Sequence, residues 1–316
     1  MAVYIFRRLA FFLGALFVAS ILIFVMIRAA GGNVAAIVLG RDASAAAIAE
    51  LSREYGLDRA WVVQYFDWIG GMLQGDLGRS FRTGESVADL VVTRLSISVP
   101  LALAGLALGL LIAIPAGMYA ARNAGRPSGA MIGLLSQIGI AVPVFWAGIL
   151  LSLLFGVKLG WLPTGGWTAW TDDFGGAVRS LVLPVLSLGL IMGAVMIRYV
   201  RSAVLDVMNQ DFVRTARAVG MTQTQALLRV GLRNAALPIV TVIGLQMAEL
   251  IGGTVIIETV FSLPGLARMI LSNVAAREVI VVQSTVMLII VFVIFVNLVV
   301  DLLYGLLDPR TRSAAR

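Results

Sequence analysis

Six long apolar runs constrain the fold of this chain more than any other feature of its sequence. They are Leu9–Ile27, Leu95–Ala121, Pro127–Val157, Ser180–Ile197, Asn234–Ile257 and Val279–Val300. Each reaches or approaches the roughly 20 residues that an α-helix needs to cross the hydrocarbon core of a bilayer. Because no water is present there to bond the backbone, helices are the expected structure. The sequence therefore predicts an all-α integral membrane protein with six transmembrane helices.

The composition supports a membrane protein and excludes several kinds of chemistry. Hydrophobic residues make up 60% of the chain and charged residues 13%, whereas a soluble domain carries roughly 25% charged residues. Too little polar surface would remain to face water. The chain has no Cys and no His, which removes disulfides, thiolate chemistry, the usual zinc sites and the commonest general base. We expect no catalytic residues and no metal site.

Two of the runs allow a second interpretation. With Arg7 and Arg8 before it, the first resembles a signal peptide, but it is too long for an ordinary apolar core and no clean A-x-A cleavage site follows. We therefore predict a span that stays in the mature protein. The third run is longer than one span needs, and we expect it to include part of a flanking segment. Proline lacks a backbone donor, so we expect bends in or near span ends at Pro100, Pro115, Pro143, Pro184 and Pro238.

Arginines in the short loops predict the orientation. They precede the first run and follow the sixth, and they lie between the second and third runs and between the fourth and fifth. These residues are Arg7, Arg8, Arg122, Arg126, Arg198, Arg201, Arg214, Arg217, Arg229, Arg233, Arg310, Arg312 and Arg316. On the other side, basic residues are offset by acidic ones, including Glu258 and Glu278. The positive-inside rule then predicts that both termini and loop 198–233 are cytoplasmic.

The long segment 28–94 between the first two spans is predicted to be a small extracytoplasmic helical element. Ile48, Leu51 and Tyr55 form a helical stripe that Gly56 closes, and Asp58 fits an N-cap for a second helix. The pattern suits a helical cap packed on the membrane face. It also suits a docking surface for a soluble partner, and the two interpretations are compatible.

Loop 198–233 is too long for a simple turn. Val204, Val207, Met208, Phe212 and Ala216 fit one helical face, which predicts a helix that ends at Gly220, since glycine accepts the left-handed conformation. Thr222 and Gln225 have the spacing of a capping box for a second helix. The small residues Thr215, Ala216 and Ala218 would allow another surface to approach closely. From composition alone, a helix pair resting on lipid headgroups remains equally open.

The same loop resembles the signature of ABC importer permeases, a degenerate E-A-A-x3-G-x9-I-x-L-P motif. Arg214-Thr215-Ala216 stands in place of E-A-A, Gly220 is the central glycine, and Val230 and Leu232 take the I and L positions. Arg233 replaces the final proline. These departures match the dipeptide/oligopeptide branch of the family. Segments 55–81, 258–270 and 297–310 also look like that branch, so the resemblance covers nearly the whole chain.

The resemblance implies a type I ABC importer permease fold, with an N-terminal span and extracytoplasmic segment (1–93), a permease core (94–305) and a cytoplasmic tail (306–316). It also implies a bacterial inner-membrane location, a second homologous permease, two ATP-binding subunits and an extracytoplasmic substrate-binding protein. Loop 204–232 would couple to the ATPase. The residues that it would use are Asp211, Phe212, Arg214, Thr215, Ala216, Arg217, Ala218 and Gly220.

The chain carries no nucleotide-binding motif of its own. A P-loop needs G-x-x-x-x-G-K-[ST], and the single lysine, Lys158, follows Val157 instead of glycine. We therefore expect no cofactor in this chain, with ATP and Mg²⁺ bound by partner subunits. Nucleic acid is not an expected partner, because the excess of basic residues is accounted for by topology.

Polar residues inside the spans are candidates for a translocation path. Gln246 and Glu249 lie in the fifth run and Asn297 in the sixth, and ionisable groups in a bilayer are costly enough to suggest function. Glu249 would bind an amine or a cationic side chain. Alternatively, it pairs with an arginine of another subunit, or is protonated and bonds a neighbouring helix. For Asp301 a structural role is predicted.

Two other functions compete with the importer permease. An ion-coupled secondary transporter would carry no coupling loop and would usually show inverted repeats. A six-span receptor or membrane enzyme is disfavoured by the missing catalytic residues. The resemblance implies small peptides as substrates, and glutathione, nickel chelates and antimicrobial peptides remain alternatives.

Overall fold

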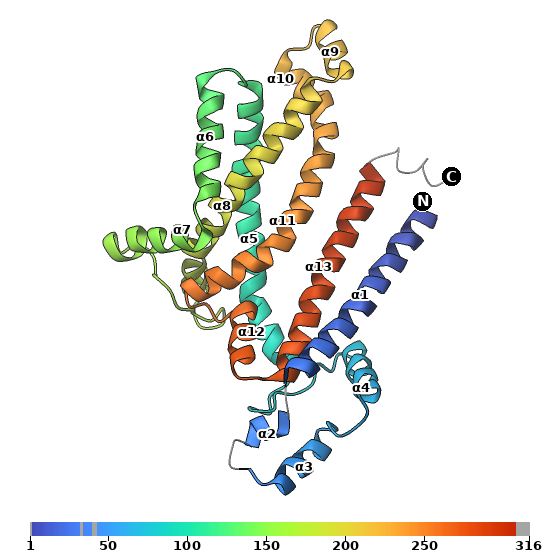
Figure 1. Ribbon diagram of the computed structural model, residues 1–316. Coiled ribbons are helices and arrows are strands. Elements are labelled where there is room, and N and C mark those ends of the chain that lie inside the picture. The colour runs from blue at the N-terminus through green and yellow to red at the C-terminus, as the bar shows by residue number, and fades with distance from the viewer. Residues whose placement is uncertain (1, 32–33, 40–42, 308–316) are drawn as a thin grey trace. The chain divides into compact units, whose positions relative to one another are not determined.

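The computed structural model describes residues 2–31, 34–39 and 43–307 as a helical chain (Figure 1). The helices are α1 (Ala2–Gly31), α2 (Val34–Leu39), α3 (Ala45–Glu54), α4 (Trp61–Leu73), α5 (Val87–Arg122), α6 (Pro127–Ala141), α7 (Val144–Leu151), η1 (Ser152–Lys158), α8 (Phe174–Met208), α9 (Asp211–Ala218), α10 (Gln223–Ala226), η2 (Leu227–Gly231), α11 (Leu232–Val260), α12 (Leu266–Ala275) and α13 (Val279–Leu307). The predicted tail lies outside the described residues from position 308 onward.

The apolar runs form helices, as predicted, but the number of spans is confirmed only in part. Within the described residues, α1, α5, α8 and α13 are long and apolar enough to cross a bilayer. The bent pair of α6 with α7 and η1 makes a fifth if it is one span. Helix α11 has 29 residues and contains the fifth run. It is not included in this number of spans, because several of its side chains are not described.

The third run is bent instead of straight. Residues 127–141 and 144–158 meet at an angle of 96°. Val142 has extended backbone angles (φ −83°, ψ 118°), and Pro143 then caps the start of α7. A residue before proline avoids the helical conformation, and proline has no N–H to continue the helix. Of the predicted bends, the one at Pro143 is confirmed, whereas Pro100, Pro115 and Pro184 lie inside α5 and α8.

The chain divides into two compact units. Unit 1 contains residues 98–264 and the chain from 299 onward, and unit 2 contains residues 2–97 and 265–298. In unit 1, α8 is the central helix and packs against α6, α7 and α11. Its apolar core runs through Met196, Val200 and Val204 to Leu227. These buried side chains hold the α9–α10 end of the unit to the long helices.

Small residues let the unit 1 helices approach closely. A Cβ added at Gly117 of α5 would lie 2.7 Å from Val200, and one at Gly189 of α8 would lie 2.7 Å from Leu108. Small residues at helix contacts are typical of membrane proteins, where backbones gain packing energy by close approach. The side-chain hydroxyl of Ser136 on α6 also donates to the Ala194 carbonyl of α8 at 2.7 Å.

Unit 2 joins the N-terminal helices to α12 and the first part of α13. The Ser20 and Tyr65 hydroxyls are 2.8 Å apart and link α1 to α4. The indole N–H of Trp68 donates to Ser284 Oγ of α13 at 3.3 Å. Between α4 and α5 the chain forms an isolated β-bridge between Arg79 and Ser86. These contacts fix the predicted extracytoplasmic segment on the helices of its own unit.

The predicted helix ends in this segment are partly right. Helix α3 ends at Glu54, and Gly56 adopts φ +65° as expected, while Ser44 caps its start by accepting from the Ala47 N–H at 3.2 Å. Asp58 is not an N-cap, so that prediction was wrong. The N-cap of α4 is Ala60, which makes no side-chain capping bond among the described residues. The amide of Gln64 instead binds the preceding turn, donating to the Leu57 and Arg59 carbonyls.

Candidate coupling surface and translocation path

The predicted first helix of loop 198–233 is two helices in the structure. Val204, Val207 and Met208 belong to the end of α8, which continues to Met208, and α9 begins only at Asp211. Asn209 ends α8, and Gln210 is extended (φ −76°, ψ 150°). Asparagine disfavours helix interiors because its side chain competes for backbone hydrogen bonds. Asp211 in the first turn of α9 is favoured there by the helix dipole.

Helix α9 is anchored on one face by two small apolar side chains. Val213 is 2% exposed and Ala216 is 8% exposed, and both belong to the unit 1 core with Leu227 and Val207. Burying a valine side chain contributes about 1.5–3 kcal/mol. Ala216 packs against its own chain, in agreement with its place on the predicted apolar face, and its part in coupling stays a prediction. Val213, which the loop's helical pattern did not single out, is the second anchor.

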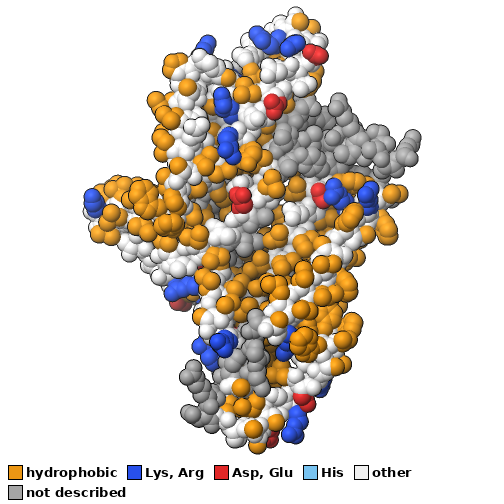
Figure 2. Space-filling view, viewed as in Figure 1, with side chains coloured by type: hydrophobic (Ala, Val, Ile, Leu, Met, Phe, Trp, Pro, Cys, Tyr) orange, Lys and Arg blue, Asp and Glu red, His pale blue; other side chains and the backbone are white. Residues whose placement is uncertain are grey.

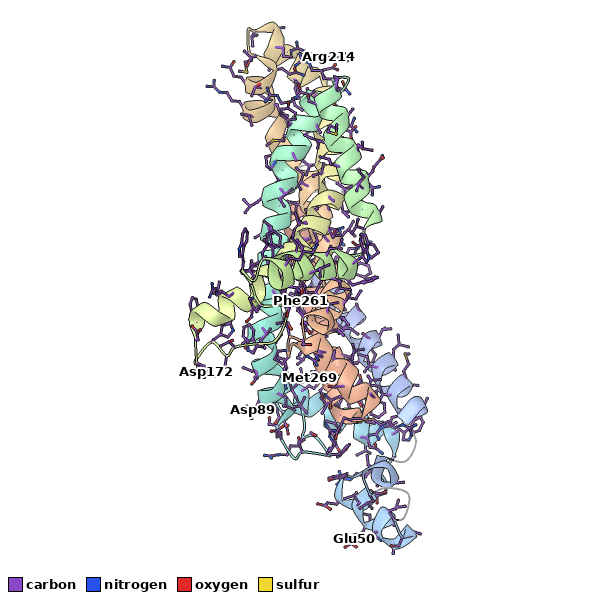
Figure 3. The ribbon with its side chains drawn as sticks, turned by 90° about the vertical axis from the view of Figure 1, so that its left-hand side faces the viewer. Glu50, Asp89, Asp172, Arg214, Phe261 and Met269 are labelled. Carbon is purple, nitrogen blue, oxygen red and sulfur yellow. The ribbon has the colours of Figure 1, made fainter. Side chains whose placement is uncertain are left out.

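The other residues predicted for coupling cover the outer side of α9. Asp211, Phe212, Arg214, Thr215, Arg217 and Ala218, with Gly220 just beyond the helix, are all exposed. We call these residues, together with the 73%-exposed Val219, the α9 surface. Figure 2 shows basic side chains gathered at this end of unit 1, and Figure 3 places Arg214 far from Phe261 along the helices. The Arg214–Asp211 contact of 3.5 Å is exposed and contributes little to stability.

The two turn signals predicted after α9 are confirmed. Gly220 has φ +96°, and the backbone N–H groups of Gly220 and Met221 bond back to Arg217 and Ala216. Thr222 accepts from the Gln225 N–H at 3.3 Å, and Gln225 Oε1 accepts from the Thr222 N–H at 3.1 Å. This capping box starts α10, which passes through η2 directly into α11. The α9 surface is thus connected to a long helix by a short, well-bonded turn.

Two of the three predicted path residues lie together on α11. The Gln246 amide, 5% exposed, donates to Glu249 Oε2 at 3.0 Å, and Glu249 itself is exposed. The next residue, Leu250, packs with Leu106 and Met192 in a buried cluster. Glu249 therefore occupies the side of α11 that its own unit leaves uncovered.

The remaining polar residues of the sixth run are on α13. Asn297 is exposed and belongs to unit 2, whereas Asp301 is half-buried and belongs to unit 1. The path role of Asn297 and the structural role of Asp301 both stay predictions.

Sequence reasoning missed two buried carboxylates. Glu258, 0% exposed, accepts a hydrogen bond from the Ser98 hydroxyl, and Glu278, 3% exposed, accepts from the Phe81 and Arg82 backbone N–H groups at 3.1 and 2.7 Å. The charge pattern treated both as exposed loop acids. A signal for Glu258 was present, because it begins the family-like block 258–270. Glu278 had no such signal, since its partners lie almost 200 positions earlier in the chain.

Comparison with known families covers almost the whole chain. The family described as "Binding-protein-dependent transport system inner membrane component" matches residues 113–313. Its companion, "Binding-prot-dependent transport system membrane comp, N-term", matches residues 1–102. The α9 surface and the α11 pair therefore both lie within the first match.

Individual relatives are similar over their full length. The oligopeptide transport system permease protein AppB of Bacillus subtilis (strain 168) is 37% identical over 313 residues, covering 98% of this chain and 99% of that protein. The glutathione transport system permease protein GsiC of Escherichia coli (strain K12) is 35% identical over 309 residues, covering 98% of each. Among solved structures, the inward-facing MetNI methionine ABC transporter (native crystal form) matches with a TM-score of 0.57. That match has 16% identity and covers 69% of this chain and 96% of that one, which shows a shared fold.

Proposed function

Because the chain belongs to the family of binding-protein-dependent transport system inner membrane components, we propose that it is the permease subunit of an ATP-driven importer of small peptides. The α9 surface docks on a separate ATP-binding subunit. The observation that carries this proposal is the division of α9 into two faces. Val213 and Ala216 seat the helix on its own chain, and the charged and apolar residues around them stay uncovered.

The anchoring of α9 gives this contact a mechanical consequence. On its inner side α9 packs on the end of α8, and through α10 and η2 it is connected to α11. Movement of a docked ATPase would therefore move the ends of two long helices together. We propose that nucleotide-driven closure of the ATPases shifts the spans between inward- and outward-facing arrangements in this way.

The proposed assembly completes what this chain lacks. It comprises six spans in this chain, a second homologous permease, two ATP-binding subunits that hold ATP and Mg²⁺, and a soluble binding protein outside. In this proposal both termini and the α9 surface lie in the cytoplasm of a bacterial cell, an orientation that the positive-inside rule predicts from the arginine distribution. Division of the chain at 93/94 and 305/306 stays a prediction.

Small peptides are the proposed substrate class. Two relatives of similar length are named for oligopeptide and glutathione transport, and glutathione is itself a short peptide. Few charged side chains lie within the spans, which favours a loosely selective path, with an external binding protein choosing the cargo. Nickel chelates and antimicrobial peptides remain alternatives for the same architecture.

Within this importer, we assign the path to the Gln246–Glu249 pair on α11, with Asn297 as a further candidate. A carboxylate exposed on a membrane helix is costly unless water or a partner reaches it. Glu249 is held by Gln246 through one hydrogen bond and retains acceptor capacity for a substrate amine. A pairing with an arginine of the second permease is the competing role.

Co-purification tests the coupling assignment. The full chain, co-expressed with its ATP-binding subunits, should bring them down, and a variant lacking residues 212–220 should lose at least tenfold of that association. Deletion of residues 45–53 of α3, a helix with no buried side chain, is the control of equal length and should retain it. ATPase binding that survives removal of 212–220 would show that coupling occurs elsewhere.

A single substitution tests the path assignment. Glu249→Gln keeps the shape and the bond to Gln246 but removes the charge, so uptake of peptides with a free amine should fall severalfold. Uptake of N-acetylated peptides should change little. If every peptide were transported with unchanged affinity and rate, Glu249 would not contact substrate.

A further inference from the structure

A cavity of about 280 Å³ lies within unit 2, and none of its lining residues belongs to the α9 surface or the α11 pair. Its walls come from the last turns of α1, the α3–α4 turn, α4, residues 76–78 and the first turn of α13. Residues of the predicted extracytoplasmic segment contribute most of this lining. Neither the coupling nor the path assignment accounts for it.

Two of the lining residues each have a side-chain polar atom that is shielded from solvent and has no hydrogen-bond partner among the described residues. These atoms are Gln64 Oε1 and Arg28 Nε. Gln64 is 8% exposed, and its Nε2 donates to the Leu57 and Arg59 carbonyls at 3.1 and 2.7 Å, which fixes the oxygen on the other side of the amide. An unsatisfied buried group costs about 1–3 kcal/mol. Such groups usually bond water or a ligand.

Arg28 is held as a ready anion-binding group. Its guanidinium lies 5.4 Å from the ring centre of Phe24. Phe24 in turn stacks on Trp68 at 6.2 Å, and Trp68 is bonded to Ser284. The guanidinium therefore packs beside an aromatic wall. A carboxylate can accept two parallel hydrogen bonds from the edge of a guanidinium group.

The cavity lining includes acidic residues as well as basic ones. Glu54, Asp67 and Asp76 are among its lining residues, together with Arg28 and Arg59. Asp67 is paired with Arg59 at 3.2 Å, and Asp76 accepts from the Gly78 N–H at 2.8 Å. Glu54 is exposed and has no such bond among the described residues. Because acidic groups outnumber basic ones, a ligand with both charges fits better than a simple anion.

We propose that this cavity binds a zwitterionic amino acid or dipeptide, with its carboxylate on Arg28 and its ammonium group toward Gln64 Oε1 and Glu54. The inference rests on the proposed function only for the choice of a peptide probe. It adds to the permease a second peptide site, which shares no residue with the Gln246–Glu249 pair. A phosphatidylethanolamine head group offers similar chemistry, but the lining belongs mainly to the segment outside the spans, which favours a soluble ligand.

Equilibrium binding to the purified full chain in phosphatidylcholine nanodiscs tests the proposal, with radiolabelled L-alanyl-L-alanine as the probe. The wild type should bind it saturably, and Arg28→Gln should bind it at least tenfold more weakly. Arg53→Gln is the matched control, because it removes the same charge from exposed α3 outside the cavity, and it should bind as the wild type does. The dipeptide amide should bind the wild type tenfold more weakly, with no further loss on Arg28→Gln.

A second variant keeps the test decisive if Arg28→Gln misfolds. Glu54→Gln should weaken the dipeptide severalfold but leave its N-acetyl form unchanged. Absence of saturable binding to the wild type, or equal binding of the dipeptide and its amide, would overturn the proposal. Binding that disappears when phosphatidylethanolamine replaces phosphatidylcholine would overturn it in favour of a lipid site. Because no ATP-binding subunit is present, either result leaves the α9 coupling test unaffected.

Discussion

The α9 surface and the buried carboxylates show two opposite uses of polar residues in one membrane protein. Glu278 is nearly inaccessible and accepts two backbone N–H groups of its own unit. On α9, by contrast, the charged side chains are exposed, and only small apolar residues face inward. A polar group satisfied by its own chain is a structural element. One left uncovered on a seated helix is available to a partner.

The comparison predicts its largest effect at the anchor of α9. Val213→Asp puts an unpaired charge at a 2%-exposed position, which should cost the docked helix about 3 kcal/mol or more. Trypsin should then cleave after Arg214 and Arg217 at least tenfold faster, and ATPase capture should be lost. Val219→Asp makes the same change at a 73%-exposed position and should leave the cleavage rate unchanged. Equal cleavage of both variants would show that Val213 does not seat α9.

A smaller loss of stability is expected at the buried carboxylate. Glu278→Gln replaces one accepting oxygen with an amide NH2 group, a donor that would face a backbone N–H, which should lower the free energy of unfolding by about 1–3 kcal/mol. The control is Glu85→Gln, at an exposed glutamate of the same unit. It should change the free energy of unfolding by less than about 0.5 kcal/mol. Thermal unfolding in detergent measures both. Similar melting temperatures for the two variants would contradict the structural role of Glu278.

Next comes the turn that ends α9. Gly220→Ala forces a side chain into a backbone with φ +96°, which should cost about 1–2 kcal/mol locally. The nearby space is open, so the loss comes from the backbone alone. Gly133→Ala, at a helical glycine of α6 that also has open space, should be neutral or slightly stabilising. ATPase capture by the two variants is the measurement, and an unaffected Gly220→Ala would remove this turn from the coupling element.

The smallest effects on stability are expected at two exposed ion pairs, which should differ only in their effect on ATPase association. Arg214→Gln and Arg59→Gln each break one, with contact distances of 3.5 and 3.2 Å to Asp211 and Asp67. Both should change the free energy of unfolding by less than about 0.5 kcal/mol. Only Arg214→Gln should weaken ATPase association, and more so at low salt. A loss of association in both variants would mean that the α9 surface has no special role.

Local signals in the sequence were sufficient for much of the fold. Apolar runs predicted the long helices, and Gly220 and the Thr222–Gln225 capping box were predicted because each depends on residues within four positions. The break at Asn209–Gln210 was missed because apolar periodicity continued across it. The bend at Pro143 was predicted as one of five, but its 96° angle was not.

The candidate site was predictable in outline only. The motif located the α9 surface, yet the burial of Val213, which the helical pattern did not single out, depends on a cluster with Leu227 and Val207 from other helices. Burial of Glu278 depends on backbone groups of Phe81 and Arg82. The cavity at Arg28 gathers five separate segments. Such contacts join distant parts of the chain, so spacing along the sequence does not reveal them.

Single-cysteine cross-linking tests the central claim most directly, because the chain contains no cysteine of its own. Val219→Cys places a thiol on the α9 surface, and Trp61→Cys places one at a comparably exposed position of α4, 57% exposed in the wild type. In membranes containing the assembled importer, the first variant should cross-link to the ATP-binding subunit and the second should not. No cross-link from Val219→Cys, or equal cross-links from both, would contradict docking of the ATPase on α9.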